Sequence, residues 1–167
     1  MATNLQRQHV KGLCLWLLGK EPQIDYLQRR PMTTASISEQ DLVDLFAAGR
    51  HIATDCSETS TLICRLAGLE DPNNLGYNGA GFTGTMLANP NMAHYTDPAG
   101  ANVGALAVFG PAPGNHVATV IGPGADPWLF SHGSQDGPKR VRMSVELAAQ
   151  KRIHGTDVYT FLNVSKL

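Results

Sequence analysis

The sequence has few of the features that mark specialised classes of protein. Only three cysteines occur among its 167 residues, Cys14, Cys56 and Cys64, and no two of them form a CxxC pair. An odd number of scattered cysteines argues against a disulfide framework and favours a reduced or redox-indifferent protein. The apolar run at 12–19 is too short to cross a membrane. We therefore expect no membrane insertion.

Charge of either sign is also sparse. The formal net charge is -1, which gives no electrostatic reason to expect nucleic acid or an anionic membrane as a partner. Arg7 and Lys11 precede the apolar run as in a signal peptide, but Lys20, Glu21 and Pro22 follow it in place of a small-residue cleavage site. We expect a chain that is made in the cytoplasm without a signal peptide.

The first half of the chain has a helical pattern. Apolar residues recur at spacings of three and four from Val10 to Leu18, as in a helix with one buried face. Ser38 predicts the start of a second helix that Gly49 ends, and Asp55 predicts the start of a third that ends at Gly68.

The second half has the pattern of strands. Short apolar segments bounded by Gly, Pro or Asp predict strands at 105–109, 116–122, 128–132 and 157–164, with a short helix at 144–151. Between the halves, 71–98 is rich in Asn, Gly and Pro, which predicts a long structured loop of a kind that is usually functional. We predict an α+β fold in which N-terminal helices pack on a C-terminal antiparallel sheet. A single domain at 1–167 is expected, with 1–23 as a helical extension of a core at about 24–164.

Cys56 is the candidate nucleophile. Asp55 is predicted to cap a helix, so Cys56 falls in its first turn, where unpaired N–H groups and the helix dipole favour a thiolate. The same N–H groups can bind the oxyanion that forms when a thiolate attacks an amide. A free cysteine is more often a small buried hydrophobic residue, and we interpret Cys14 and Cys64 in that way. The residues that flank Cys56 are all polar, which favours a functional role.

His116 is the candidate general base, since it begins a predicted strand. If the hairpin that follows turns about Gly124, positions that sum to 248 face each other, and His116 lies opposite His132. A base that is oriented by a third polar group is the general form of a catalytic triad. A slip of one residue would exchange His132 for Ser131 on that face. Asn115 and Asp136 are the other candidate orienting residues.

These motifs, in this order, resemble the NlpC/P60 cysteine peptidases, which have a papain-like fold and cleave peptides of bacterial cell walls. The likeness is closest to NlpC/P60-type proteins of bacteriophages and covers about 24–138. The segments that carry it, besides Asp55-Cys56-Ser57 and His116-Val117-Ala118, are Leu75-Gly76-Tyr77-Asn78-Gly79, Phe82-Thr83-Gly84-Thr85-Met86-Leu87, Val108-Phe109-Gly110 and Phe130-Ser131-His132-Gly133.

The resemblance implies a role for several residues. Cys56 matches the nucleophile, His116 the base and His132 the third polar residue, and Tyr26 resembles the family tyrosine whose hydroxyl helps to polarise the scissile carbonyl. The implied activity is that of a thiol endopeptidase without a cofactor, which cuts the peptide stem of peptidoglycan, commonly between D-glutamate and the diamino acid. We expect Tyr77 and Phe82 of the long loop, together with Asp55 and Ser57, to bind the substrate.

The resemblance also implies a setting for the protein. A phage endolysin or virion-associated lysin fits a chain that is made in the cytoplasm and reaches the wall after lysis, through a pore or within a virion. We expect it to act as a monomer, with the wall peptide as its partner.

The sequence departs from the family at one place that matters. The family usually continues Asp-Cys-Ser with a small residue, whereas Glu58 and Thr59 follow here. Glu58 puts a carboxylate within one turn of the thiol, where it opposes an anionic nucleophile.

Three alternatives stay open at this point. Cys56, His116 and His132 are residue types that suit a zinc site, although the close ligand pair usual in such sites is missing. The thiol chemistry can also act on another amide or ester, or in acyl transfer. The third alternative is an inactive wall-binding or virion-structural module with the same fold.

Overall fold

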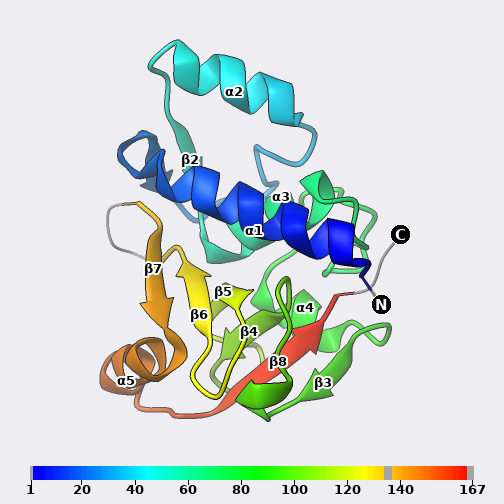
Figure 1. Cartoon of the computed structure of the whole chain (residues 1–167), viewed down its shortest axis with the longest axis vertical. Coiled ribbons are helices and arrows are strands. Elements are labelled where there is room, and N and C mark those ends of the chain that lie inside the picture. The colour runs from blue at the N-terminus through cyan, green and yellow to red at the C-terminus, as the bar shows by residue number, and fades with distance from the viewer. Residues whose placement is uncertain (1, 134–136, 165–167) are drawn as a thin grey trace.

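The computed structural model describes residues 2–133 and 137–164, which form helices packed against an antiparallel sheet (Figure 1). The first helix, α1 (Asn4–Leu18), begins at a Thr3 cap and buries one face at the spacing that the sequence predicted. The second, α2 (Glu39–Ala47), begins at Ser38, whose hydroxyl accepts a hydrogen bond from Asp41 N–H. The third, α3 (Cys56–Leu66), begins at Asp55. The three predicted N-terminal helices are confirmed.

The main sheet has six strands in the order β3-β8-β4-β5-β6-β7, and all neighbours are antiparallel. The strands are β3 (Ala93–Tyr95), β4 (Leu106–Phe109), β5 (His116–Gly122), β6 (Trp128–Ser131), β7 (Lys139–Arg142) and β8 (Tyr159–Asn163). Together with the helices, this sheet confirms the predicted α+β class.

A second, two-stranded sheet lies beside the start of α3. Its strands β1 (Ile24–Tyr26) and β2 (Ile52–Thr54) pair in parallel, so that Tyr26 lies next to Thr54. Only Asp55 separates β2 from α3, which fixes the helix start against this small sheet. The short helix η1 (Glu21–Gln23) precedes β1.

The two faces of the main sheet bury different groups of residues. One face carries Val117 and Ile121 of β5 and packs against α1 and α3. The other carries Ala118 and Val120 and belongs to a second core with Phe161. This alternation is what a strand buried on both faces requires. His116 begins β5, so its position decides which group of residues its ring can reach.

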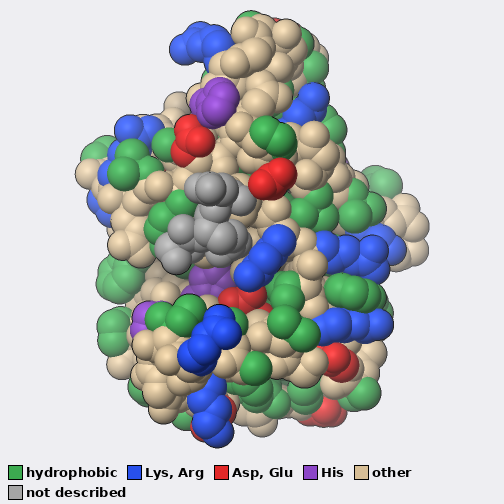
Figure 2. Space-filling view, turned by 90° about the vertical axis from the view of Figure 1, so that its left-hand side faces the viewer, with side chains coloured by type: hydrophobic (Ala, Val, Ile, Leu, Met, Phe, Trp, Pro, Cys, Tyr) green, Lys and Arg blue, Asp and Glu red, His purple; other side chains and the backbone are tan. Residues whose placement is uncertain are grey.

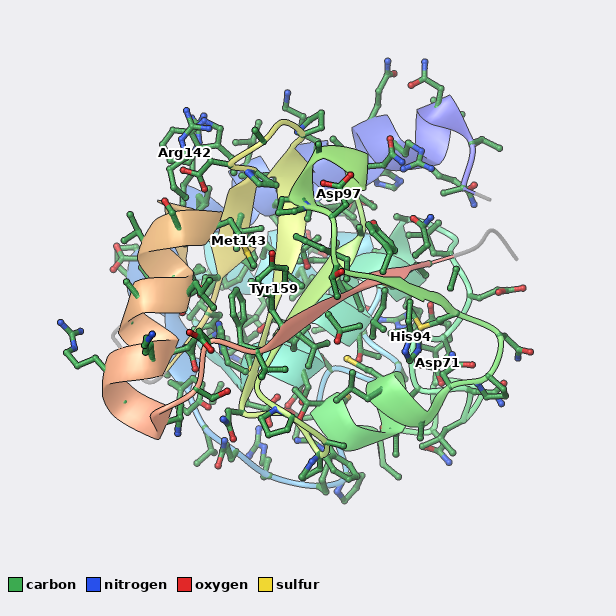
Figure 3. All side chains as sticks on the ribbon, turned by 90° about the horizontal axis from the view of Figure 1, so that it is seen from below. Asp71, His94, Asp97, Arg142, Met143 and Tyr159 are labelled. Atoms are coloured by element: carbon green, nitrogen blue, oxygen red, sulfur yellow. The ribbon has the colours of Figure 1, made fainter. Side chains whose placement is uncertain are left out.

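Helix α5 (Met143–His154) follows β7 directly, and it confirms the helix predicted at 144–151. Met143 is buried in the second core, and Tyr159 packs against the same core from the start of β8 (Figure 3). Asp126 fixes the beginning of α5, because its carboxylate accepts hydrogen bonds from the backbone N–H and the hydroxyl of Ser144, both at 2.8 Å.

Parts of the fold differ from the prediction, among them the parallel pair of β1 and β2, which was not predicted. The segment at 71–98 holds a helix, α4 (Thr83–Ala88), and the strand β3, and the short helix η2 (Pro98–Gly100) follows it. The strand β7 was not predicted, because it has no hydrophobic pattern. Its residues Lys139, Arg140 and Arg142 are charged and exposed, and only Val141 is buried. Charged side chains on an edge strand protect it from pairing with other chains.

The predicted register of the hairpin is wrong by one residue. The structure pairs Ala118 with Ser131 and Val120 with Leu129, so facing positions sum to 249, and the register shifts again between Val120 and Gly122. An irregularity of this kind takes up an extra residue in one strand, which the sequence pattern does not reveal. His132 therefore does not lie opposite His116.

Candidate active site

Cys56 is the first residue of α3, and its side chain is buried, with 6% exposed. The backbone N–H groups of Val117 and Ser57 are directed at its sulfur and favour the thiolate. Burial and, after it, the Asp55 carboxylate outweigh them and raise the pKa of the Cys56 thiol to about 11. The helix start alone therefore does not activate this cysteine, and the resting residue is a thiol.

Asp55 holds the beginning of α3 and is itself held by Arg30. Its Oδ1 accepts hydrogen bonds from Glu58 N–H and Ser57 Oγ–H, both at 2.7 Å. Its Oδ2 accepts one from Arg30 Nη1 at 2.8 Å, and Arg30 Nη2 donates to Ser57 Oγ at 2.6 Å. The two predicted substrate-binding residues Asp55 and Ser57 are thus bonded to each other and to Arg30. Nothing in the sequence had singled out Arg30.

His116 lies at the beginning of β5 with 4% of its surface exposed. Its ring stacks on Phe109 at a centroid distance of 5.9 Å, on the sheet face of the second core. Its Nε2 lies 2.9 Å from Ser131 Oγ and 3.7 Å from Glu146 Oε1. Burial lowers the pKa of His116 to about 4, although the Glu146 carboxylate acts in the opposite direction. The resting ring is therefore neutral.

The loop before β5 sets the position of His116. Asn115 N–H donates to Phe109 O at 2.7 Å, which closes the connection from β4. Gly110 has a φ of 91°, and a Cβ at this position would lie 3.2 Å from the Asn115 backbone nitrogen. Only glycine combines this backbone conformation with so close an approach.

His132 occupies a different environment from His116. Its Nδ1 lies 3.1 Å from Thr59 Oγ1 and 3.3 Å from Thr54 Oγ1, and its ring meets the Tyr26 ring edge to face at 5.5 Å. Its Nε2 is buried and has no hydrogen-bond partner in the part of the chain that the structure describes. Burial and, after it, His116 lower the pKa of His132 to about 4. His132 therefore lies between β1 and α3 rather than at the Nε2 of His116.

Cys56 and His116 are brought together through Val117. Val117 shares a buried cluster with Cys56 on one face of the sheet, and His116 precedes it in β5 with its ring stacked on Phe109 of the other face. In the described part of the chain, no hydrogen bond links this sulfur to the ring of His116 or His132. The candidate nucleophile and base are neighbours that do not touch in this state.

Tyr26 completes this group of predicted residues. Its hydroxyl accepts a hydrogen bond from Gln28 Nε2 at 3.0 Å. Burial and, after it, the nearby Cys56 raise the pKa of Tyr26, so its hydroxyl stays protonated. A protonated hydroxyl beside the thiol can donate to a carbonyl oxygen.

Two cavities meet at Gln28 and Asn115. One, of about 380 Å³, is lined by Asp55, Cys56 and Ser57 and by residues of other segments, including Arg29, Phe82 and Thr83. The other, of about 530 Å³, is lined by His116, Tyr26 and residues of β7 and α5, including Lys139 and Glu146. Figure 2 shows the face toward β7 and α5, where histidine and acidic side chains lie recessed between basic ones. The candidate nucleophile and base thus line adjoining spaces.

The two aromatic residues of the long loop have different positions. Phe82 is 44% exposed and lines the cavity of Cys56, and its binding of a substrate stays a prediction. The Tyr77 hydroxyl donates to Leu69 O at 2.8 Å, and the residue does not line either cavity next to Cys56. Burial raises the pKa of Tyr77. The structure gives Tyr77 the contacts of a packing residue.

Glu58 is directed away from the thiol. Its side chain is fully buried, and its Oε1 accepts hydrogen bonds from Thr34 N–H at 3.0 Å and Thr34 Oγ1 at 2.9 Å. The carboxylate thus anchors the loop that follows Arg30. It is not among the groups that shift the pKa of Cys56.

The remaining predictions concern metal ligands and the third polar residue. In residues 2–133 and 137–164, no group of three or more His, Cys, Asp or Glu side chains is arranged to hold a metal ion. Cys14 and Cys64 are buried in the core, as expected. Asp136 lies outside the described residues.

Two residues beside His116, Ser131 and Glu146, were not predicted from the sequence as partners of its ring. Ser131 was available only as the result of a one-residue slip in register. Glu146 lay within a predicted helix, but a short helix with little amphipathic pattern does not reveal which side chain faces the sheet.

Comparisons of this chain with protein-family models, with curated proteins and with solved structures found no match. None of the helices in the described ranges is long and apolar enough to span a membrane. Function is therefore inferred from the site and from the resemblance of its motifs.

Proposed function

We propose that this chain is a thiol peptidase with a papain-like fold of the NlpC/P60 type, which hydrolyses an amide bond in the peptide stem of bacterial peptidoglycan. The observation that carries the proposal is the packing of α3 on β5, which puts Cys56 and Val117 in one buried cluster. It puts the start of β5, and with it His116, beside a cysteine at a helix N-terminus. The two cavities that meet there leave room for a chain on both sides of a scissile bond.

The first step is attack on the carbonyl carbon. Because the resting pair is a neutral thiol and a neutral imidazole, His116 takes the thiol proton as the sulfur attacks. The N–H groups at the start of α3 and the Tyr26 hydroxyl stabilise the oxyanion. Nδ1 of His116 accepts the proton, because Nε2 faces Ser131.

The second half of the reaction restores the enzyme. The imidazolium of His116 gives its proton to the leaving amine as the carbon–nitrogen bond breaks, which leaves a thioester on Cys56. Water then attacks the thioester while His116 removes one of its protons. The acid product departs, and the proton returns to the sulfur. The amine side of the substrate belongs in the cavity of His116, because this residue protonates the leaving group.

The substrate class and setting come from the resemblance. The bond between D-glutamate and the diamino acid is the proposed point of cleavage. A phage endolysin or virion-associated lysin, which reaches the wall after lysis, through a pore or within a virion, is the proposed biological role.

The experiment that tests this function is digestion of isolated peptidoglycan of several wall chemistries, with mass spectrometry of the soluble fragments. Fragments with a new amino terminus at the diamino acid support the proposal and identify the bond. Release of acids or amines from other amides or esters, without stem-peptide fragments, would show that the same thiol chemistry acts on a different substrate.

An inactive wall-binding or virion-structural module is the second candidate. Two observations favour it: the raised pKa of the Cys56 thiol and, within the described residues, the lack of a hydrogen bond between that thiol and His116. Binding to isolated walls without release of free amines would establish this second function.

A further inference from the structure

The environment of His116 contains a carboxylate that the mechanism above does not use. Glu146 projects from α5 with 3% of its surface exposed, and its Oε1 lies 3.7 Å from His116 Nε2. Its Oε2 is buried, has no hydrogen-bond partner among the described residues, and lies 3.9 Å from Lys139 Nζ. A buried carboxylate oxygen that accepts no hydrogen bond is costly unless it serves a function.

The position of Glu146 is fixed by its own helix. Gln150, one turn later, donates from Nε2 to Glu146 Oε1 at 2.9 Å. At the start of the helix, Met143 N–H donates to Pro127 O at 2.9 Å, and Asp126 caps Ser144. These contacts fix α5, and with it the Glu146 carboxylate, beside His116.

The proposed reaction creates a charge at this place. When His116 accepts the thiol proton it becomes a buried imidazolium, and an uncompensated ion in a protein interior costs several kcal/mol. Asp55 cannot compensate it fully, because both of its carboxylate oxygens are already bonded to Ser57, Glu58 and Arg30. Glu146 has one oxygen near Nε2 and a second with no hydrogen bond.

We propose that Glu146 is the positioning residue of the site: with Ser131 it holds His116 as the Nε2–H tautomer and compensates the charge of the imidazolium. This inference rests on the proposed function for its catalytic part. Nδ1 then carries the lone pair that accepts the thiol proton. The three residues are arranged as in a catalytic triad, except that α5 and not the neighbouring strand supplies the carboxylate.

Some of the other charged groups around His116 raise its pKa and others lower it. Asp55 favours its protonated form together with Glu146, whereas Lys139 of β7 and His154 of α5 oppose it. His132 faces the same region from the end of β6. Glu146 is the largest favourable contribution among these groups. Its removal is therefore expected to leave only weaker compensation for the imidazolium.

The test compares wild-type protein with Glu146→Gln, which keeps the volume and the acceptor for Gln150. Long-range ¹H–¹⁵N correlation spectra report the tautomer of His116. We expect the Nε2–H form in the wild type and a mixture of tautomers, or the Nδ1–H form, in the variant. On a cleaved stem peptide, kcat is expected to fall by about 10- to 100-fold with KM changed less than about threefold.

Two further variants separate this role from a structural one. Lys151→Ala removes an exposed ion pair with Asp157 near the other end of α5 and is expected to leave the tautomer of His116 and kcat unchanged. Glu146→Asp keeps the charge and is expected to recover at least about tenfold of the kcat lost in Glu146→Gln. If Glu146→Gln does not fold, the spectrum of the wild type decides: His116 in the Nε2–H form supports the inference, and His116 in the Nδ1–H form overturns it.

The outcomes are distinct from those for the proposed function. An unchanged tautomer in a folded Glu146→Gln protein overturns the inference, whatever the wild type hydrolyses. A changed tautomer with unchanged kcat overturns the positioning role. A wild type that cleaves no wall peptide overturns the proposed function and with it the catalytic part of the inference, while the spectra still decide whether Glu146 sets the tautomer.

Discussion

Ser131 Oγ lies 2.9 Å from Nε2 of His116, and this contact follows from the register in which β5 and β6 pair. Ala118 faces Ser131, so the hydroxyl reaches the end of β5 from the neighbouring strand. The ring of His116 is thereby turned with Nε2 toward Ser131 and Glu146. The orientation of the proposed base depends on a pairing that is specified by two strands together.

Arg30 is expected to stabilise the start of α3. Arg30→Ala leaves the Asp55 carboxylate, 5% exposed, without its cationic partner and removes a hydrogen bond to Ser57. We expect the free energy of unfolding to fall by about 2–3 kcal/mol, since Arg30 itself is partly exposed. Chemical denaturation measures this change. Arg29→Ala, which removes only a surface bond to Thr33, is the matched control and should cost less than about 0.5 kcal/mol. Equal effects of the two variants would contradict this account of the cap.

Glu58 is expected to serve the fold and not to inhibit the thiol. Glu58→Ala leaves the N–H group and hydroxyl of Thr34 buried without their acceptor, and should lower the free energy of unfolding by about 2–4 kcal/mol. Glu58→Gln, which keeps an acceptor oxygen, should cost less and leave the pKa of the Cys56 thiol unchanged. The pH dependence of alkylation by iodoacetamide measures that pKa. Asp55→Asn is the contrasting variant and should lower it, because Asp55 raises it. A lowered thiol pKa in Glu58→Gln would show that the carboxylate does act on the sulfur.

Acid is expected to destabilise the fold through its buried histidines. The pKa values of His116 and His132 are lowered from 6.5 to about 4, so between these pH values the unfolded chain binds more protons than the folded one. The stability that the neutral rings contribute is therefore fully present above pH 6.5 and is lost as the pH falls toward 4. The loss by pH 4 is on the order of 3 kcal/mol for each ring and about 6 kcal/mol for both, since one pKa unit corresponds to about 1.4 kcal/mol. Thermal unfolding measured from pH 7 to pH 4 tests this, and His132→Asn should reduce the loss by about half. A flat profile over this range would refute neutral burial of the two rings.

The fold could be predicted from the sequence wherever one local pattern decided the structure. Ser38 and Asp55 begin their helices as expected, because a cap depends only on residues one turn away. β7 could not be predicted, because a charged edge strand has no hydrophobic period.

The candidate site was predictable only in part, because local sequence patterns reveal some of its residues and not others. Cys56 and His116 were singled out by their places at the start of a helix and of a strand, and their neighbourhood arises from the packing of α3 on β5. Ser131 and Glu146 depend on register and on helix rotation, which are set by contacts between elements far apart in the chain.

The most direct test of the central claim is a comparison of peptidoglycan digestion by the wild type, Cys56→Ala and Cys64→Ala. Both substituted cysteines lie on α3, but Cys64 is in the core, so its replacement controls for a change in packing on the same helix. We predict that the wild type and Cys64→Ala release stem-peptide fragments, whereas Cys56→Ala releases none and keeps its far-ultraviolet circular dichroism spectrum. Fragments released by a folded Cys56→Ala protein would contradict the assignment of Cys56 as the nucleophile.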